Sequence, residues 1–300
     1  MKAEPPTLAA RAEYAMALGM RFLPIAWVSA LGGYLGRRYV RRAQRLERRW
    51  VARLLNNLDY LKGPTDQAQR RQRLLAYGDQ VGRVYTELTV LKRILDSSRF
   101  RVEGEHHLRG HEGPLILVAP HLANWELLAG VLTLIDKPLV DLYEPRESEL
   151  RMRIAMRTRQ SLDGVEVEWV PTDSGMAMRR VKAALARGNH TMLFCDEIRQ
   201  GVSQGPSLGR ELPYAGNRWM AARLAVRHGA TIVPMRIVRE GGAHFTLRIE
   251  APLAADLAAN PDADPDMRAR ELANKIDTLF DGWVREHPEH WYWLKDVRVF

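Results

Sequence analysis

From about residue 100 onward, short apolar runs rich in β-branched and aromatic residues alternate with longer amphipathic segments. The apolar runs have the composition and length of strands and occupy residues 114–119, 138–143, 165–170, 190–195, 231–238 and 244–250. The amphipathic segments predict helices over residues 125–134, 147–162, 175–187 and 216–228, with a capped final helix that ends before Pro288. This alternation predicts an α/β fold with a mainly parallel central sheet flanked by helices. In such sheets, ligands bind beyond the carboxyl ends of the strands.

The length and composition of the chain are those of a protein with a large buried core. Its 300 residues are 46% hydrophobic, enough for one main domain, which we assign to residues 63–300. Residues 1–62 differ in charge and are assigned to a separate N-terminal segment. The single cysteine, Cys195, excludes an internal disulfide and fits a reducing compartment or a cytoplasmic membrane face. Because Cys195 ends an apolar run, we expect a buried small hydrophobe rather than a nucleophile.

The N-terminal segment carries almost all of the excess positive charge. Residues 1–62 contain 12 Lys and Arg against 4 Asp and Glu, a net charge of +8, whereas the whole chain has +9. An uncharged apolar stretch at residues 22–36 precedes an arginine-rich amphipathic helix that begins near residue 37. A membrane-spanning helix needs about 20 apolar residues, so this stretch is short. We therefore expect an apolar and basic helical membrane anchor that dips into one leaflet and binds an anionic membrane surface.

Two alternatives remain for the arginine-rich helix. It could be a solvated helix that packs on its own domain, or residues 37–53 could bind nucleic acid. The adjacent apolar stretch favours the membrane over nucleic acid. A cleaved secretory signal does not fit, because its positive charges would precede the apolar part, so we expect the segment to stay attached.

One polar turn stands at the end of the first apolar run of the main domain. His121 follows the run directly, Asn124 is a good residue to cap the next helix, and Glu126 falls in its first turn. His121 would therefore lie in a loop at the carboxyl end of a strand, where a reacting group belongs. Residues five apart on a continuous helix face different directions, so His121 and Glu126 meet only if the chain bends between them. An acid in a first helical turn is also favoured without any function.

The stretch HLANWELL, residues 121–128, resembles the His-x4-Glu/Asp signature of the lipid A biosynthesis lauroyl/myristoyl acyltransferase family. Further similarity follows in the same order along the chain, at residues 143–160, 181–197, 216–235 and 287–294. Three details depart from the family pattern: Asp196-Glu197 replaces an Asp-Gln pair, residues 207–216 replace a phenylalanine-rich loop, and Lys295-Asp296 replaces His-Arg. Because of these departures, the resemblance does not determine the shape of the acyl pocket or the identity of the acceptor.

The resemblance implies an O-acyltransferase of glycerolipid acyltransferase-like fold at the cytoplasmic face of the inner membrane. It would move a fatty acyl chain from an acyl carrier protein or coenzyme A thioester to a hydroxyl of a glycolipid or lysolipid. Phosphatidylinositol mannoside and other lysophospholipid acyltransferases look similar in this region and remain alternatives. No cofactor or metal is implied, because the acyl thioester is a co-substrate. Nucleic acid is not an expected partner.

The resemblance also assigns roles to individual residues. His121 would be the general base that takes the proton of the acceptor alcohol. Glu126 would hold the imidazole in the correct tautomer, and Glu197 is a rival for that role. The resemblance further implies substrate contacts, for which the candidates are Asn124, Arg157, Arg159 and Asp196. An arginine in this set could pair with a phosphate of the donor or acceptor.

Three other features could carry chemistry. Residues 201–205 fit the Gly-x-Ser-x-Gly pattern, which would make Ser203 an esterase nucleophile, but Pro206 follows where a helix should begin. The histidines at 106, 107 and 111 lack the spacing of a zinc site. Trp291, Tyr292 and Trp293 are interpreted as core or interfacial packing rather than a binding platform.

Overall fold

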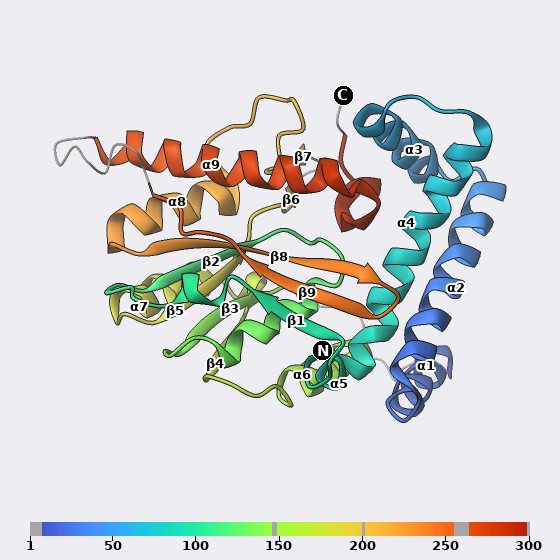
Figure 1. Ribbon diagram of the computed structural model, residues 1–300, viewed down its shortest axis with the longest axis horizontal. Coiled ribbons are helices and arrows are strands. Elements are labelled where there is room, and N and C mark those ends of the chain that lie inside the picture. Colours follow the sequence, from blue (N-terminus) through green and yellow to red (C-terminus); the bar gives the residue numbers. More distant parts are fainter. Residues whose placement is uncertain (1–7, 146–148, 200–201, 255–263, 299–300) are drawn as a thin grey trace.

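The computed structural model describes residues 8–145, 149–199, 202–254 and 264–298. Figure 1 shows a central twisted sheet with helices on both faces and a group of N-terminal helices along one side. The seven strands of the sheet are β1 (Phe100–Glu103), β2 (Leu115–Ala119), β3 (Leu139–Tyr143), β4 (Val167–Pro171), β5 (His190–Phe194), β8 (Thr231–Gly241) and β9 (His244–Ile249). Their order across the sheet is β1-β9-β8-β2-β5-β3-β4.

Every neighbouring pair in this sheet is parallel except the hairpin of β8 and β9. The expected mainly parallel sheet flanked by helices is therefore confirmed, and the six predicted strands agree with the structure to within a few residues. The edge strand β1 was not predicted, because four residues are too few to show a period. A separate two-stranded hairpin, β6 (Ile198–Arg199) and β7 (Val202–Ser203), follows β5.

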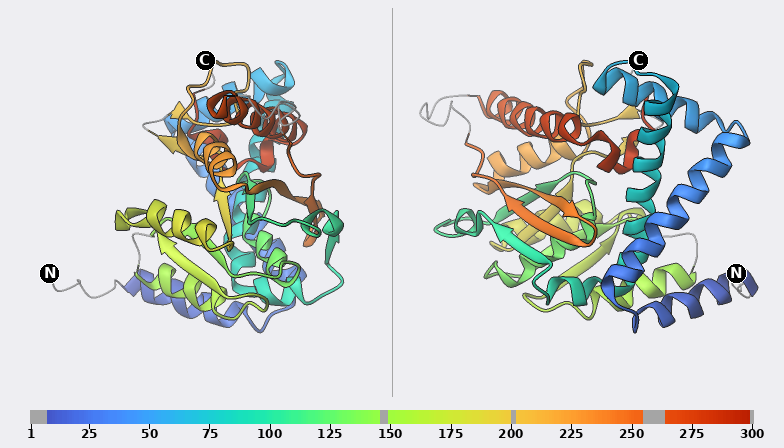
Figure 2. Two further views of the ribbon diagram at one scale, coloured as in Figure 1. Left: turned by 90° about the vertical axis from the view of Figure 1, so that its left-hand side faces the viewer. Right: turned by 45° about the vertical axis from the view of Figure 1, so that its right-hand side comes forward.

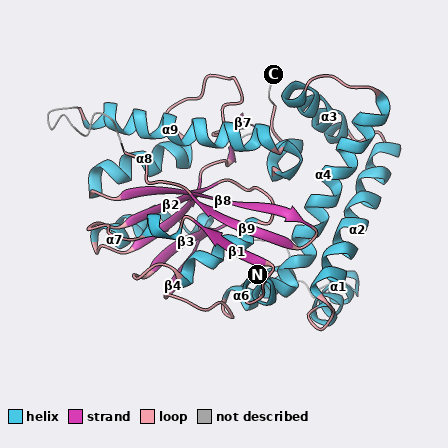
Figure 3. Cartoon of the chain, in the orientation of Figure 1, coloured by secondary structure: helices cyan, strands magenta, loops and turns pink. Residues whose placement is uncertain are grey.

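The helices cover both faces of the sheet (Figure 3). The α-helices are α1 (Leu8–Met20), α2 (Ile25–Arg45), α3 (Arg49–Lys62), α4 (Gln67–Glu87), α5 (Leu91–Leu95), α6 (Glu149–Arg159), α7 (Ala177–Ala186), α8 (Gly216–His228) and α9 (Pro265–Glu286). The 3-10 helices are η1 (Leu88–Val90), η2 (Glu105–Leu108), η3 (Trp125–Thr133), η4 (Thr172–Ser174), η6 (Pro288–His290) and η7 (Tyr292–Lys295). The segment predicted as a helix over 125–134 is thus a 3-10 helix.

Alternate residues of the central strand β2 enter two different cores. Ile116 and Val118 pack with α7, α8 and α9, whereas Leu115, Leu117 and Ala119 pack with α5 and η3 on the opposite face. Because both faces are covered, all five residues of β2 are buried and apolar. The carboxyl end of this strand, where the chain leaves the sheet, is the place that the sequence assigns to His121.

The N-terminal helices pack on the rest of the protein. α2 runs along α4 (Figure 2), and glycines at the contact allow the two backbones to approach closely. A Cβ atom at Gly36 would lie 1.8 Å from the carbonyl oxygen of Gly78, and one at Gly82 would lie 2.2 Å from that of Gly32. Larger residues at these positions would force the helices apart.

The arginine-rich segment is divided between two helices rather than forming one. The chain breaks at Leu46–Arg48, where Glu47 has a positive φ of 48°, and α3 then leaves in a new direction. The apolar face expected of this helix is buried against the protein itself at Val40, Leu54 and Leu58. This part of the segment therefore follows the alternative of a helix packed on its own domain.

The start of the N-terminal segment keeps exposed apolar side chains. Phe22 is 88% exposed, Trp27 67% and Tyr39 62%, on and just before α2. Within the ranges that the structure describes, none of the helices is both long and apolar enough to cross a membrane. The interfacial anchor and the boundary at residue 62 stay predictions.

A buried ion pair ties α2, α4 and the β8–β9 hairpin to the loop after β2. Glu87, at the end of α4, is completely buried and pairs with the guanidinium of Arg239 through contacts of 2.7 and 2.9 Å. Ser29 of α2 donates to the same carboxylate at 2.6 Å, and the amide of Asn124 donates to it at 2.9 Å. Four hydrogen bonds from three distant segments compensate the burial of this charge.

Removal of the Arg239 side chain should therefore destabilise the folded protein. We expect Arg239→Ala to lower the free energy of unfolding by about 3–5 kcal/mol, because the Glu87 carboxylate would remain buried without its cation. Arg248→Ala is the matched control, since Arg248 and its partner Glu103 are solvated, and it should change stability by less than about 1 kcal/mol. Urea unfolding of both variants measures the difference, and equal effects would contradict the role of the buried pair.

Candidate active site

His121 lies in the loop after β2, at the carboxyl end of the strand as expected. The loop turns sharply, because the amide of Leu122 donates to the carbonyl of Pro120 at 2.8 Å and Ala123 takes a positive φ of 49°. A non-glycine residue in this region is uncommon and indicates a turn held by its surroundings. The bend places His121 and Glu126 on the wall of one cavity.

The imidazole of His121 is held by Asp196, which follows β5. The Asp196 Oδ1 atom lies 2.7 Å from His121 Nδ1, and Oδ2 accepts the backbone N–H of His121 at 2.7 Å. The indole N–H of Trp291 also donates to Oδ2, at 2.9 Å. Asp196 is completely buried, so these three contacts account for the carboxylate in the absence of water.

This arrangement determines which nitrogen of His121 can act as a base. A carboxylate at 2.7 Å requires Nδ1 to carry the proton, which leaves Nε2 with its lone pair. Trp293 Nε1 also lies 3.2 Å from Nδ1, but an N–H cannot donate to a protonated nitrogen, so the shorter contact with the charged group decides. The imidazole itself is 19% exposed and stacks on Phe194, with ring centroids 4.2 Å apart. Nε2 is therefore available as a general base.

The two glutamates proposed as partners of His121 have other positions. Glu197 turns away and accepts the N–H of Asn217 at 2.6 Å, which caps the beginning of α8. Glu126 forms an ion pair with Arg159 at 3.7 Å in the same cavity as His121. The expectation that one of them orients the imidazole is corrected: Asp196 has that position, because β5 lies beside β2 in the sheet.

The C-terminal residues hold the His121 loop from the other side. The N–H of Ala123 donates to the carbonyl of His290 at 3.0 Å, and the N–H of Tyr292 donates to the carbonyl of His121 at 3.0 Å. Leu122 and Trp291 form an isolated antiparallel bridge between these bonds. The loop is therefore fixed by main-chain hydrogen bonds to a segment about 170 residues further along the chain.

The three aromatic residues of the tail, which we interpreted as packing, divide between the core and the cavity. Trp291 is completely buried in the core, whereas Tyr292 and Trp293 line the cavity around His121. Their rings lie 6.4 and 5.6 Å from the imidazole, centroid to centroid. The sequence of the tail alone does not distinguish the aromatic residue in the core from the two that line the cavity.

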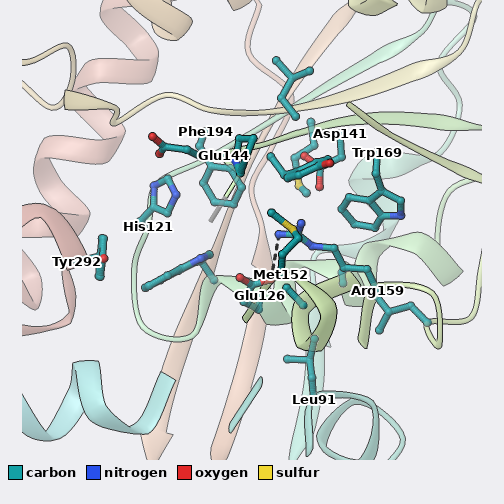
Figure 4. Close-up of a pocket in the computed structure, with 18 of the residues that line it drawn as sticks. Leu91, His121, Glu126, Asp141, Glu144, Met152, Arg159, Trp169, Phe194 and Tyr292 are labelled. Atoms are coloured by element: carbon teal, nitrogen blue, oxygen red, sulfur yellow. Dashed lines mark ion pairs between the residues drawn. The ribbon is translucent and has the colours of Figure 1, made fainter. Parts of the chain in front are cut away.

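The cavity has a volume of about 410 Å³ and combines titratable groups with an apolar lining. Figure 4 shows His121 and Tyr292 on one side and Asp141, Trp169 and Arg159 on the other. The guanidinium of Arg159 lies 4.9 Å from the ring centroid of Trp169 and 5.4 Å from that of Tyr143, besides its pair with Glu126. These contacts hold Arg159 in place inside the cavity.

Three of the four expected substrate contacts fall elsewhere. Asp196 is completely buried and binds His121 instead of lining the cavity. Arg157 is exposed and borders a small separate pocket with Tyr14 and Arg21. Asn124 is completely buried, and its amide is used by Glu87. The substrate contact expected of Asn124 is therefore corrected to a structural role in the Glu87 network.

The competing nucleophiles are buried. Ser203 is completely buried and its hydroxyl donates to the carbonyl of Gly205, away from the cavity that contains His121. Cys195 is a buried residue as expected, and burial raises the pKa of its thiol well above the usual value. In the part of the chain that the structure covers, no three His, Cys, Asp or Glu side chains form a group that could hold a metal ion.

Asp141, which the sequence did not single out, is a buried acid on the cavity wall. It lies on β3 between Met192 of β5 and Trp169 of β4, in register with both. Burial raises its pKa to about 7, opposed by the charge of Arg159 and reinforced by that of Glu126. Its side chain is 5% exposed and its Oδ1 atom has no hydrogen-bond partner. The sequence does contain a signal for Asp141, because it is the one charged residue in the predicted apolar strand at residues 138–143.

The titration of Asp141 should appear in the pH dependence of stability. The Asp141 carboxyl of the folded protein keeps its proton to about pH 7. In the unfolded chain an aspartate has a pKa of about 3.9 and loses its proton there. The stability of the folded state therefore falls as the pH rises from about 4 to about 7, and this contribution is constant above that range. We expect Asp141→Asn to gain stability over the wild type, with a larger gain at about pH 8 than at about pH 5. Urea unfolding at both values checks this, and a gain independent of pH would contradict the buried acid.

The sequence matches the family model described as bacterial lipid A biosynthesis acyltransferase over residues 7–297. No curated protein matches it. Among solved structures, the chain is similar to the 1-acyl-sn-glycerophosphate acyltransferase PlsC from Thermotoga maritima, with 16% identity and a TM-score of 0.38. That similarity covers 86% of this chain and 98% of the other.

The family match includes every residue of the cavity described above, from Tyr85 to Trp293. The chain is a lipid acyltransferase and belongs to the bacterial lipid A biosynthesis acyltransferase family.

Proposed function

We propose that the enzyme moves a fatty acyl chain from an acyl carrier protein or coenzyme A thioester to a hydroxyl of a glycolipid or lysolipid acceptor. The observation that carries this proposal is the His121–Asp196 pair, with its free Nε2 atom on the wall of a cavity. Membership of the family supports the substrate class. Both substrates would be bound together, without an acyl-enzyme intermediate.

His121 would act as the general base. Its Nε2 atom removes the proton of the acceptor hydroxyl while the oxygen attacks the thioester carbonyl. The resulting imidazolium is stabilised by the Asp196 carboxylate at 2.7 Å. When the tetrahedral intermediate collapses, the carbon–sulfur bond breaks and the imidazolium returns its proton to the leaving thiolate. The products are the ester and the free thiol.

Arg159 is the cavity cation that we propose to contact substrate. Its pair with Glu126 and its two aromatic neighbours limit its movement, so its guanidinium presents fixed donors. A phosphate of the donor or acceptor could accept two of these hydrogen bonds. Glu126 would then be a positioning residue for Arg159.

We further propose that the enzyme works at the cytoplasmic face of the inner membrane. The exposed side chains of Phe22, Trp27 and Tyr39 lie on α2 and just before it, next to the arginine-rich residues 37–53. Apolar and aromatic side chains bury in the interface while basic residues bind anionic headgroups. This combination favours a lipid surface over nucleic acid as the partner of the segment.

Replacement of His121 tests the proposed mechanism directly. We expect His121→Ala to lower the rate of acyl transfer about 10²- to 10⁴-fold, because the hydroxyl loses its base. Transfer of a radiolabelled acyl chain to membrane lipids, measured with purified protein, gives the rate. Full activity of this variant would reject the assignment of the base.

Ser203→Ala is the matched control for a serine esterase mechanism. Ser203 is buried outside the cavity, so we expect the variant to retain the rate of the wild type. Complete inhibition of the wild type by a fluorophosphonate, together with loss of activity in Ser203→Ala, would support the esterase instead.

A further inference from the structure

A second cavity lies between the N-terminal helices and the C-terminal tail. Its volume is about 470 Å³, and its walls come from α1, α2, α3, α4, η1, α6 and η7. The lining is apolar and aromatic, with Leu35, Tyr39, Trp50 and Val81 among its side chains. Lys295 is the one charged residue among those that line it, and its ammonium pairs with Asp296. Such a lining suits a hydrocarbon chain and not a headgroup.

This second cavity adjoins the catalytic cavity. Tyr85 of α4 and Tyr292 of the tail line both, and their hydroxyls lie 3.1 Å apart. Tyr292 also contacts Trp125, with ring centroids 4.9 Å apart, next to the His121 loop. The two tyrosines are therefore the boundary between the catalytic base and the apolar space. A molecule that reacts at His121 could extend a chain past them.

The second cavity also reaches the protein surface where apolar side chains are exposed. Four residues of its lining are themselves exposed: Met16 at 50%, Leu35 at 41%, Tyr39 at 62% and Tyr85 at 49%. Trp27 and Tyr34 continue this exposed apolar face along α2. Such a face marks a contact with a membrane or partner. A lipid that lies in a membrane next to α2 could enter the cavity sideways without passing through water.

We propose that the cavity between α1, α2 and α4 binds a hydrocarbon chain of the membrane-resident acceptor lipid, while the acyl chain of the donor occupies the catalytic cavity. This inference rests on the proposed function, and two arguments separate the two chains. The donor thioester is bound to a water-soluble carrier and reaches the enzyme from the aqueous side. Its acyl chain therefore does not enter through the exposed apolar face of α2. The acceptor starts in the membrane, and its hydroxyl must reach His121 while its chains stay in apolar surroundings.

Photo-crosslinking distinguishes the two chains without requiring turnover. One probe is a lysophosphatidylglycerol with a diazirine at the end of its acyl chain, presented in vesicles of phosphatidylglycerol and phosphatidylethanolamine. The other is an acyl-coenzyme A with a diazirine at the same position. We expect the lysolipid to label peptides with Leu35, Tyr39 and Val81, and the acyl-coenzyme A to label peptides with Leu132 and Trp169 of the catalytic cavity.

Variants that fill the second cavity sharpen the test. Val81→Trp on α4 and Leu35→Trp on α2 each add bulk to the lining from a different helix. Each should abolish lysolipid labelling while acyl-coenzyme A labelling persists. The persistent label also shows that the variants are folded. Val202→Trp is the matched control, because Val202 is 49% exposed on β7 outside both cavities, and both labels should be unchanged. In a series of lysolipids, each methylene removed should weaken binding about fourfold while the chain still fits the cavity.

The outcomes separate this inference from the proposed function. Labelling of the α2 and α4 peptides by acyl-coenzyme A instead of the lysolipid would overturn the assignment of the chains while leaving the acyltransferase mechanism intact. Lysolipid labelling that is unaffected by both Val81→Trp and Leu35→Trp would also overturn it. Loss of transfer in His121→Ala tests the mechanism alone, whichever cavity each probe labels.

Discussion

The active site depends on the burial of one carboxylate, that of Asp196. A charge inside a protein is tolerated when hydrogen bonds replace the water that it has lost. Here the replacements come from the backbone and imidazole of His121 and from the indole of Trp291. The same three bonds gather the loop after β2, the end of β5 and the C-terminal tail at one point. The same interaction therefore compensates this charge and orients the imidazole that we propose as the base.

A second buried carboxylate, that of Glu87, connects this site to the N-terminal helices. It binds Ser29 of α2, Arg239 of the hairpin and Asn124 of the His121 loop. The loop is thus held between two buried acids, one on each side of its turn. The apolar second cavity lies beside this connection, and Tyr292 lines both cavities. Placement of the N-terminal helices and shape of the active site are consequently coupled.

The sequence predicts those features that depend on local pattern. The strand periods and the position of His121 at a strand end are local, and the structure agrees with both. The partner of His121 is not local, because Asp196 is 75 residues away and adjacent only through the crossovers that bring β5 beside β2. The family resemblance of HLANWELL pointed to Glu126, which shares the cavity but pairs with Arg159. Likewise the apolar period near residue 40 did not distinguish a helix on a membrane from one packed on α4, where glycines permit the contact.

The position of the proton on the neutral His121 ring decides whether Nε2 can accept the proton of a hydroxyl. In protein labelled with ¹⁵N-histidine, a long-range ¹H–¹⁵N spectrum identifies the protonated nitrogen, and His121→Gln assigns the signals by difference. In the neutral ring we expect the proton on Nδ1, directed at Asp196, and a bare Nε2. A neutral ring protonated on Nε2 would contradict it, because the atom proposed to accept the hydroxyl proton would already be occupied.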